Sequence, residues 1–73
     1  MKQYLNLNGK SGIEAYEIGD TYVAIKFKKT NKIYTYSYHL AKKHNVDNMK
    51  NLAEKGQGLN SYIMKNVRNL YDK

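Results

Sequence analysis

The sequence contains no cysteine, no proline and no tryptophan, and its 73 residues leave room for one small domain. Without cysteine, the chain has no disulfides, no thiolate zinc site and no cysteine nucleophile. A domain of this size buries only about 60% of its unfolded surface, and small secreted domains usually compensate with disulfides. We therefore expect a cytoplasmic protein rather than an extracellular one.

Long apolar runs are also missing. No segment approaches the roughly 18 apolar residues that a membrane-spanning helix needs. The first eight residues lack the apolar core of a signal peptide. No linker, low-complexity stretch or internal repeat divides the chain. We expect residues 1–73 to form a single domain that does not contact a membrane.

Acidic residues are scarce relative to basic ones. The chain has thirteen Lys and Arg and six Asp and Glu, so its formal net charge is +7. Such an excess indicates an anionic partner, either a nucleic acid or an acidic protein surface. An AT-rich genome is an alternative source of the lysines. AT-rich codons would also enrich Asn, Tyr and Ile, and the chain contains 9 Asn, 8 Tyr and 5 Ile. Arginine, whose planar fork binds phosphate bidentately, would be stronger evidence, and the chain has only Arg68.

Alternation of apolar and polar residues predicts strands over residues 13–18, 21–28 and 33–38. We expect the first two strands to be joined by a type II′ turn with Gly19 at its first central position. Leu5 and Leu7 mark a short additional strand, followed by a turn from Gly9 to Gly12.

The length of the loop after Phe27 decides which face Tyr34, Tyr36 and Tyr38 occupy. With a loop of two or four residues, Tyr34 lies opposite Phe27 and the tyrosines join the core. With a loop of three residues, Tyr34 lies opposite Lys26, and the tyrosines form an exposed platform on which bases could stack. We favour the core, because a chain with one Phe and no Trp needs tyrosines to fill its interior.

Helical spacing replaces the alternation in the second half. One helix is predicted from the shared face of Val46, Met49, Leu52 and Ala53, with Asn45 or Asp47 as its N-cap and Gly56 as its left-handed stop. A second is predicted from Leu59, Tyr62, Ile63, Val67 and Leu70. Residues 39–45 fit either a helical turn or a loop. The expected fold is α+β: an antiparallel meander of three to four strands followed by two C-terminal helices packed on the sheet.

Four short motifs follow one another along the chain: Ser11-Gly12-Ile13, Val23-x-Ile25-x-Phe27, Tyr34-Thr35-Tyr36 and the segment over residues 55–63. Together they resemble the KTSC domain, a module found at the C-terminus of some lysyl-tRNA synthetases and as a stand-alone bacterial protein. The resemblance spans roughly residues 11–67. It departs from the family pattern at residues 38–41, where a Val-Pro step is usual, and in a hairpin one residue longer.

The resemblance implies this α+β fold and a role in RNA binding, which the synthetase context suggests for the family. It also implies structural roles for the matching signature residues, which are Tyr34, Tyr36, Gly56, Asn60 and Ile63. From the residues alone, Asn60 is most simply a helix cap or a turn residue.

No constellation of residues indicates catalysis. His39 and His44 are five residues apart, a spacing that does not align on one helical face, and no carboxylate is placed to complete a metal site. The carboxylates show no pairing suited to acid and base chemistry. Gly56-Gln57-Gly58 lacks the spacing of a phosphate-binding loop and fits a helix stop better. We expect a non-enzymatic protein without metal or cofactor.

The candidate binding residues are basic. They are Lys26, Lys28, Lys29 and Lys32 around the predicted hairpin, with Lys65 and Arg68 on the outer face of the last helix. Such groups would hold phosphates without reading sequence, although lysines on a strand edge can also serve to prevent aggregation. We expect a module that binds RNA or another nucleic acid. The alternative is a protein-interaction module, an adaptor or a phage or mobile-element inhibitor, that docks on an acidic partner. Either a monomer or an edge-paired homodimer fits the sequence.

Overall fold

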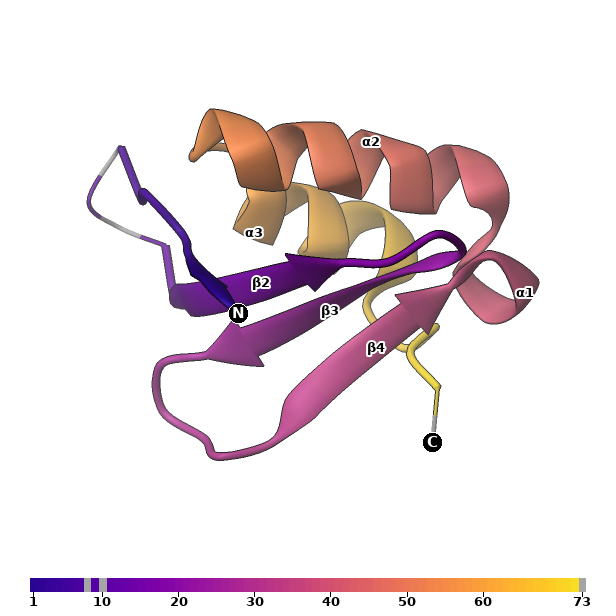
Figure 1. Cartoon of the computed structure of the whole chain (residues 1–73), viewed down its shortest axis with the longest axis horizontal. Helices are drawn as coiled ribbons and strands as arrows, with labels where there is room; N and C mark the ends of the chain where they lie inside the picture. The colour runs from indigo at the N-terminus through magenta and orange to yellow at the C-terminus, as the bar shows by residue number, and fades with distance from the viewer. Residues whose placement is uncertain (8, 10, 73) are drawn as a thin grey trace.

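A four-stranded antiparallel sheet carries its helices on one face (Figure 1). The structure, a computed structural model, describes residues 1–7, 9 and 11–72. The elements in chain order are β1 (Lys2–Gln3), β2 (Ile13–Ile18), β3 (Tyr22–Phe27), β4 (Ile33–Ser37), α1 (Tyr38–Ala41), α2 (Lys43–Lys55), α3 (Leu59–Tyr62) and the π-helical segment η1 (Ile63–Val67). The strands lie in the order β1-β2-β3-β4. The predicted α+β meander followed by helices is confirmed.

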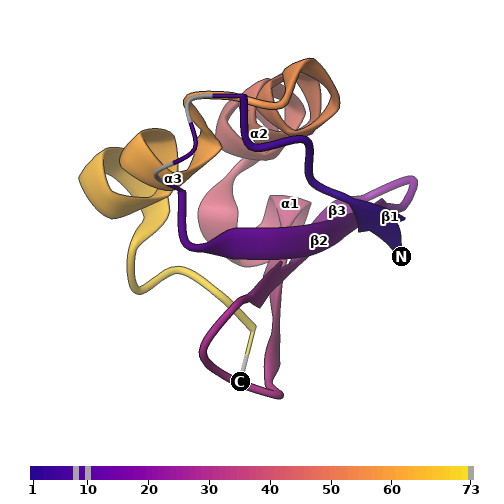
Figure 2. The same ribbon diagram turned by 90° about the vertical axis from the view of Figure 1, so that its left-hand side faces the viewer.

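The core lies between the helices and the inner face of the sheet (Figure 2). Val23 and Ile25 of β3 are fully buried there, as are Val46 and Met49 of α2 and Ile63 of η1. The inner face also receives the two β4 tyrosines, because Val23 pairs with Tyr36 and Ile25 with Tyr34. The preferred core position of the tyrosines is therefore confirmed for β4.

The pairing partners in this hairpin differ from the expected ones by two residues. The last pair is Lys26 with Ile33, so residues 28–32 form a longer loop than any of those considered. Within it, the Thr30 amide donates to the carbonyl of Phe27 at 3.4 Å, and the Lys32 amide donates to Thr30 Oγ1 at 3.1 Å. A shift of two residues preserves the face of every side chain, which is why the face was right and the partners were wrong. Tyr38 has left the strand and begins α1.

Two predictions for the first third of the chain are corrected. Gly19 does not have a positive φ and does not occupy a central turn position; its amide donates to the carbonyl of Tyr22 at 2.9 Å, which leaves residues 20–21 at the turn. The additional strand is β1 and precedes Leu5 and Leu7, which are both exposed. The turn predicted from Gly9 to Gly12 includes residue 10, which lies outside the described residues.

Helix α2 begins earlier than predicted, at Lys43, so Asn45 and Asp47 lie inside it and do not cap it. The residue before it, Lys42, has a φ of 77° and forms the tight junction with α1. Asn45 is buried instead. Its amide group donates to the carbonyl of Ala41 at 2.9 Å, and its Oδ1 accepts from the Tyr62 hydroxyl at 2.7 Å. A buried amide satisfied in this way joins α1, α2 and α3.

The last helix is shorter than its apolar spacing suggests. Segments α3 and η1 are continuous, but the wider π-helical turn ends at Val67, so Leu70 lies beyond the helix and is 40% exposed. The core position predicted for Leu70 is wrong. Asn60 is the second residue of α3, which Gly58 precedes with a φ of 84°, so Asn60 does not cap the helix.

Gly56 ends α2 as predicted, with a φ of 85° and an amide that donates to the carbonyl of Leu52. A Cβ at this position would lie 2.6 Å from the Cβ of Leu5. We expect Gly56→Ala to lower the free energy of unfolding by about 1–3 kcal/mol, because alanine must adopt a left-handed conformation and displace the N-terminal segment. Urea denaturation followed by circular dichroism measures this loss.

Gly12→Ala is the matched control. Gly12 has no positive φ, and a Cβ there would meet nothing within 4 Å. We expect a change within about 0.5 kcal/mol. Equal stability of the two variants would show that neither the backbone conformation nor the contact with Leu5 constrains Gly56.

Candidate functional site

Carboxylates gather at the end of the sheet that carries the β2–β3 turn. Asp20 lies in the turn itself, and the Tyr22 hydroxyl donates to Glu17 at 2.8 Å. The Ser37 hydroxyl donates to Asp72 at 2.8 Å, and Ser37 pairs with Tyr22 across the strands. Asp47 is linked to this turn through Tyr38 and Lys50, which donates to the carbonyl of Asp20. Four of the six acidic residues therefore lie at this end.

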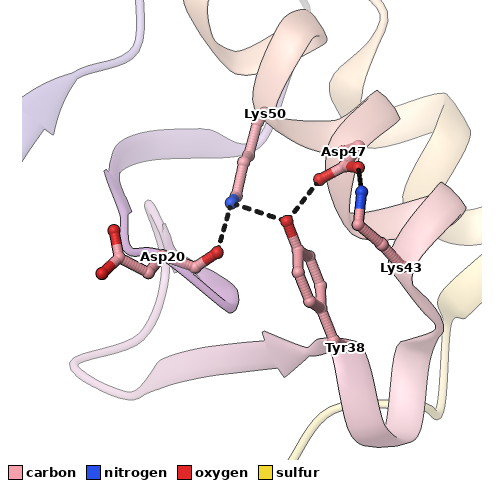
Figure 3. Close-up of polar contacts among 5 residues, drawn as sticks. All are labelled: Asp20, Tyr38, Lys43, Asp47 and Lys50. Atoms are coloured by element: carbon pink, nitrogen blue, oxygen red, sulfur yellow. Dashed lines mark hydrogen bonds and ion pairs between the residues drawn. The ribbon is translucent and has the colours of Figure 1, made fainter.

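A polar cluster around Tyr38 fastens the helices to the turn (Figure 3). The Tyr38 hydroxyl donates to Asp47 Oδ1 at 2.7 Å, and Lys43 Nζ pairs with Asp47 Oδ2 at 2.8 Å. Lys50 Nζ donates to the Tyr38 hydroxyl and to the carbonyl of Asp20, both at 3.3 Å. Both ammonium groups also lie over the Tyr38 ring, at 5.4 Å and 5.0 Å from its centroid. Lys43 and Lys50 therefore have internal partners.

The opposite end of the sheet carries the β3–β4 loop and is basic. Lys28, Lys29 and Lys32 are exposed there. The Lys28 amide donates to the carbonyl of Gly12 at 2.7 Å, which holds the base of the loop against the start of β2. Among the described residues, no carboxylate forms an ion pair with these three lysines.

Lys26 differs from its three neighbours. It is half-buried on the outer face of the sheet, and its Nζ pairs with Glu14 Oε2 at 3.0 Å. The positive charge of Lys26 is therefore already compensated within the molecule, whereas the loop lysines keep theirs available to solvent.

The C-terminal segment returns from η1 to the outer edge of β4 (Figures 1 and 2). The amide of Asp72 donates to the carbonyl of Thr35 at 2.7 Å, and the ring of Tyr71 meets the ring of Tyr34 edge to face at 4.8 Å. Between this segment, η1 and the β3–β4 loop lies an open groove of about 360 Å³. We call it the aromatic groove, because its lining includes Phe27, Tyr34, Tyr36 and Tyr71.

Arg68 joins this groove to the basic loop. It follows η1 directly, and it lines the groove together with Thr30 of the loop and Met64 of η1. The groove is therefore bordered by the arginine on one element and by the lysine-bearing loop on another. Lys65 is exposed on η1 but lies outside the groove lining.

Tyr36 does not contribute a negative charge to the groove. Burial, with smaller effects from Tyr34 and Tyr71, raises the pKa of Tyr36 to about 12. The phenol therefore stays neutral at physiological pH, and the positive charges of Arg68 and the loop are not offset by it.

Of the predicted basic set, Lys28, Lys29 and Lys32 lie on the β3–β4 loop, and Arg68 lines the groove together with Thr30 of that loop. Of the predicted signature residues, Tyr34 and Tyr36 line the groove, whereas Gly56 and Ile63 serve the fold. Sequence reasoning did not identify Phe27, Met64 or Tyr71 as groove residues. The only sequence signal for Tyr71 is its position: it is an aromatic residue directly after Leu70, where the predicted helical pattern ends.

No family model matches the chain, and no curated protein and no solved structure matches it either. The relation to the KTSC domain stays a prediction based on the four motifs. Across residues 1–7, 9 and 11–72, no group of three or more His, Cys, Asp or Glu is placed to hold a metal ion. No helix in that part of the chain is long and apolar enough to cross a membrane.

The Tyr38 cluster predicts a pH-dependent contribution to stability. The hydrogen bond from Lys43, followed by that from Tyr38, lowers the pKa of Asp47. A depressed folded-state pKa means that the stabilisation is present above the unfolded pKa of about 3.9 and is lost as the pH falls through the lower folded value. We expect Asp47→Asn to have a lower Tm than the wild type at pH 7, and the difference to shrink as the solution is acidified below about pH 4.

Thermal denaturation from neutral to acidic pH measures this difference. Glu54→Gln, an exposed residue of the same helix, is the control that removes one carboxylate without touching the cluster. A Tm difference for Asp47→Asn that stays constant on acidification would mean that the carboxylate charge does not stabilise the cluster.

Proposed function

We propose that this chain is a non-enzymatic module that binds RNA or another nucleic acid through backbone phosphates. The observation that carries the proposal is the separation of charge along the sheet. Lys28, Lys29, Lys32 and Arg68 lie at the end of the β3–β4 loop, and four of the six acidic residues lie at the other end.

The loop lysines suit phosphate binding because they are exposed and lack an ion pair among the described residues. Each ammonium group that meets a phosphate releases condensed counterions from the nucleic acid, and this release drives association at low salt. Arg68 adds a planar fork that can hold a phosphate through two hydrogen bonds. Contacts of this kind position a nucleic acid without reading its sequence.

Lys26 and Lys65 contribute less in this proposal. Lys26 would have to leave Glu14 to meet a phosphate. Lys65 is exposed and adds to the field of the basic end without lining the groove. The resemblance to the KTSC domain supports RNA as the nucleic acid, since that role has been suggested for the family.

An edge-paired homodimer finds less support. The sheet has two edge strands, β1 and β4. The C-terminal segment already occupies the outer edge of β4 at Thr35, and β1 offers only two residues for pairing. An acidic protein remains the competing partner, and the experiment below separates the two.

We predict that the triple variant Lys28→Gln/Lys29→Gln/Lys32→Gln binds single-stranded RNA much more weakly than the wild type at about 50 mM salt. Its plot of log affinity against log salt should be flatter by about 2 units, because each single-strand phosphate contact contributes about 0.7. Fluorescence anisotropy with labelled single-stranded RNA, tRNA and duplex DNA at about 50 and 200 mM salt measures both quantities.

The matched control removes the same net charge elsewhere. Lys2→Gln/Lys42→Gln/Lys55→Gln changes three exposed lysines outside the loop. We expect this variant to keep most of the affinity and the salt slope of the wild type. Equal losses in both triple variants would reduce the interaction to general attraction of polyanions by a cationic protein. The search would then turn to an acidic protein partner.

A further inference from the structure

The rings of the aromatic groove meet edge to face rather than face to face. Tyr34 lies between Phe27, at 5.6 Å and 68°, and Tyr71, at 4.8 Å and 74°. The ring of Tyr36 lies 6.3 Å from that of Tyr71, at 51°. None of these pairs is stacked in parallel: in each edge-to-face pair, the edge of one ring meets a face of the other. Tyr36 is buried, whereas Tyr34 and Tyr71 are only partly buried and line the open groove.

We propose that the aromatic groove holds an unpaired nucleobase, and that the nucleic acid bound by this chain is therefore single-stranded. This inference rests on the proposed function and specifies its substrate class. The base would lie against the rings of Tyr34 and Tyr71, while Arg68 and the loop lysines hold the adjoining phosphates.

Charge complementarity favours this occupant over an uncharged one. The groove is flanked by Arg68 and by the loop that carries Lys28, Lys29 and Lys32. A single strand presents planar apolar faces and regularly spaced negative charges side by side, and proteins bind it with aromatic rings set in a basic surface. An apolar peptide would use the rings but leave these positive charges without partners.

The small volume of the groove favours a single strand over a duplex. The volume of about 360 Å³ lies at the small end of the roughly 300–1,000 Å³ typical of ligand sites, so it suits a single group of nucleotide size. In a duplex, each base is stacked between neighbours and paired, and it reaches such a groove only if it is flipped out at a cost of a few kcal/mol. Met64, 47% exposed at the groove, supplies a further soft apolar contact.

The test compares three probes of equal length: a single-stranded RNA, an oligomer with the same ribose-phosphate backbone but no bases, and an RNA duplex. We expect the wild type to bind the single-stranded RNA roughly tenfold or more tightly than the oligomer without bases, a preference within the range of one base stacked on an aromatic ring. The duplex, whose bases are paired and stacked, should bind less tightly than the single-stranded RNA.

Tyr71→Ala should remove most of this preference and leave binding of the oligomer without bases unchanged. Tyr71→Phe, which keeps the ring, should restore the preference. Tyr22→Leu is the control, because Tyr22 lies on the outer face of the sheet, away from the groove, and contacts Glu17. Its preference for bases should equal that of the wild type.

Wild-type protein alone gives an independent readout that needs no variant to fold. In an NMR titration, the ring signals of Tyr34 and Tyr71 should shift when single-stranded RNA is added, while those of Tyr22 should not. The oligomer without bases should leave all three unchanged.

Different results would contradict the base site in the groove and the phosphate interface. If the three probes bind equally and still respond to the loop lysines, or if the duplex is preferred, the base site is wrong and the phosphate interface stands. If no probe binds at about 50 mM salt, both are wrong.

Discussion

The register between β3 and β4 sets which side chains of the two strands face the helices. Because Val23 faces Tyr36 and Ile25 faces Tyr34, two aliphatic and two aromatic side chains point to the same side of the sheet. The helices cover this side, and the core forms between them. A shift of one residue would turn the tyrosines to the outer face and leave the helices without a complementary surface. The same register therefore produces both the core and the groove.

The tyrosines change role along the strand. Tyr36 is buried beneath the helical layer, whereas Tyr34 is half-buried and meets the groove. The helical layer ends at Val67, and the C-terminal segment then crosses to β4 through Tyr71 and Asp72. Aromatic side chains thus continue past the edge of the core into a site open to solvent. A chain with one Phe and no Trp uses tyrosines for both purposes.

Charge is distributed by the same architecture. The two ends of an antiparallel hairpin are remote from each other, so residues of the β2–β3 turn and of the β3–β4 loop occupy opposite ends of the sheet. At the turn, Lys43 and Lys50 are bound within the Tyr38 cluster (Figure 3). At the loop, Lys28, Lys29 and Lys32 have no such partners among the described residues. Net charge alone would not distinguish these two groups of lysines.

Local periodicity and backbone preference were enough to predict the α+β meander, the three main strands within one residue, the buried face of α2 and the stop at Gly56. The length of the β3–β4 loop, the ion pair of Lys26 with Glu14 and the burial of Asn45 between helices became known only from the folded molecule. The same holds for the positions of Arg68 beside Thr30 and of Tyr71 beside Tyr34. These contacts join residues far apart in the chain, and neither spacing nor composition carries information about which distant groups meet.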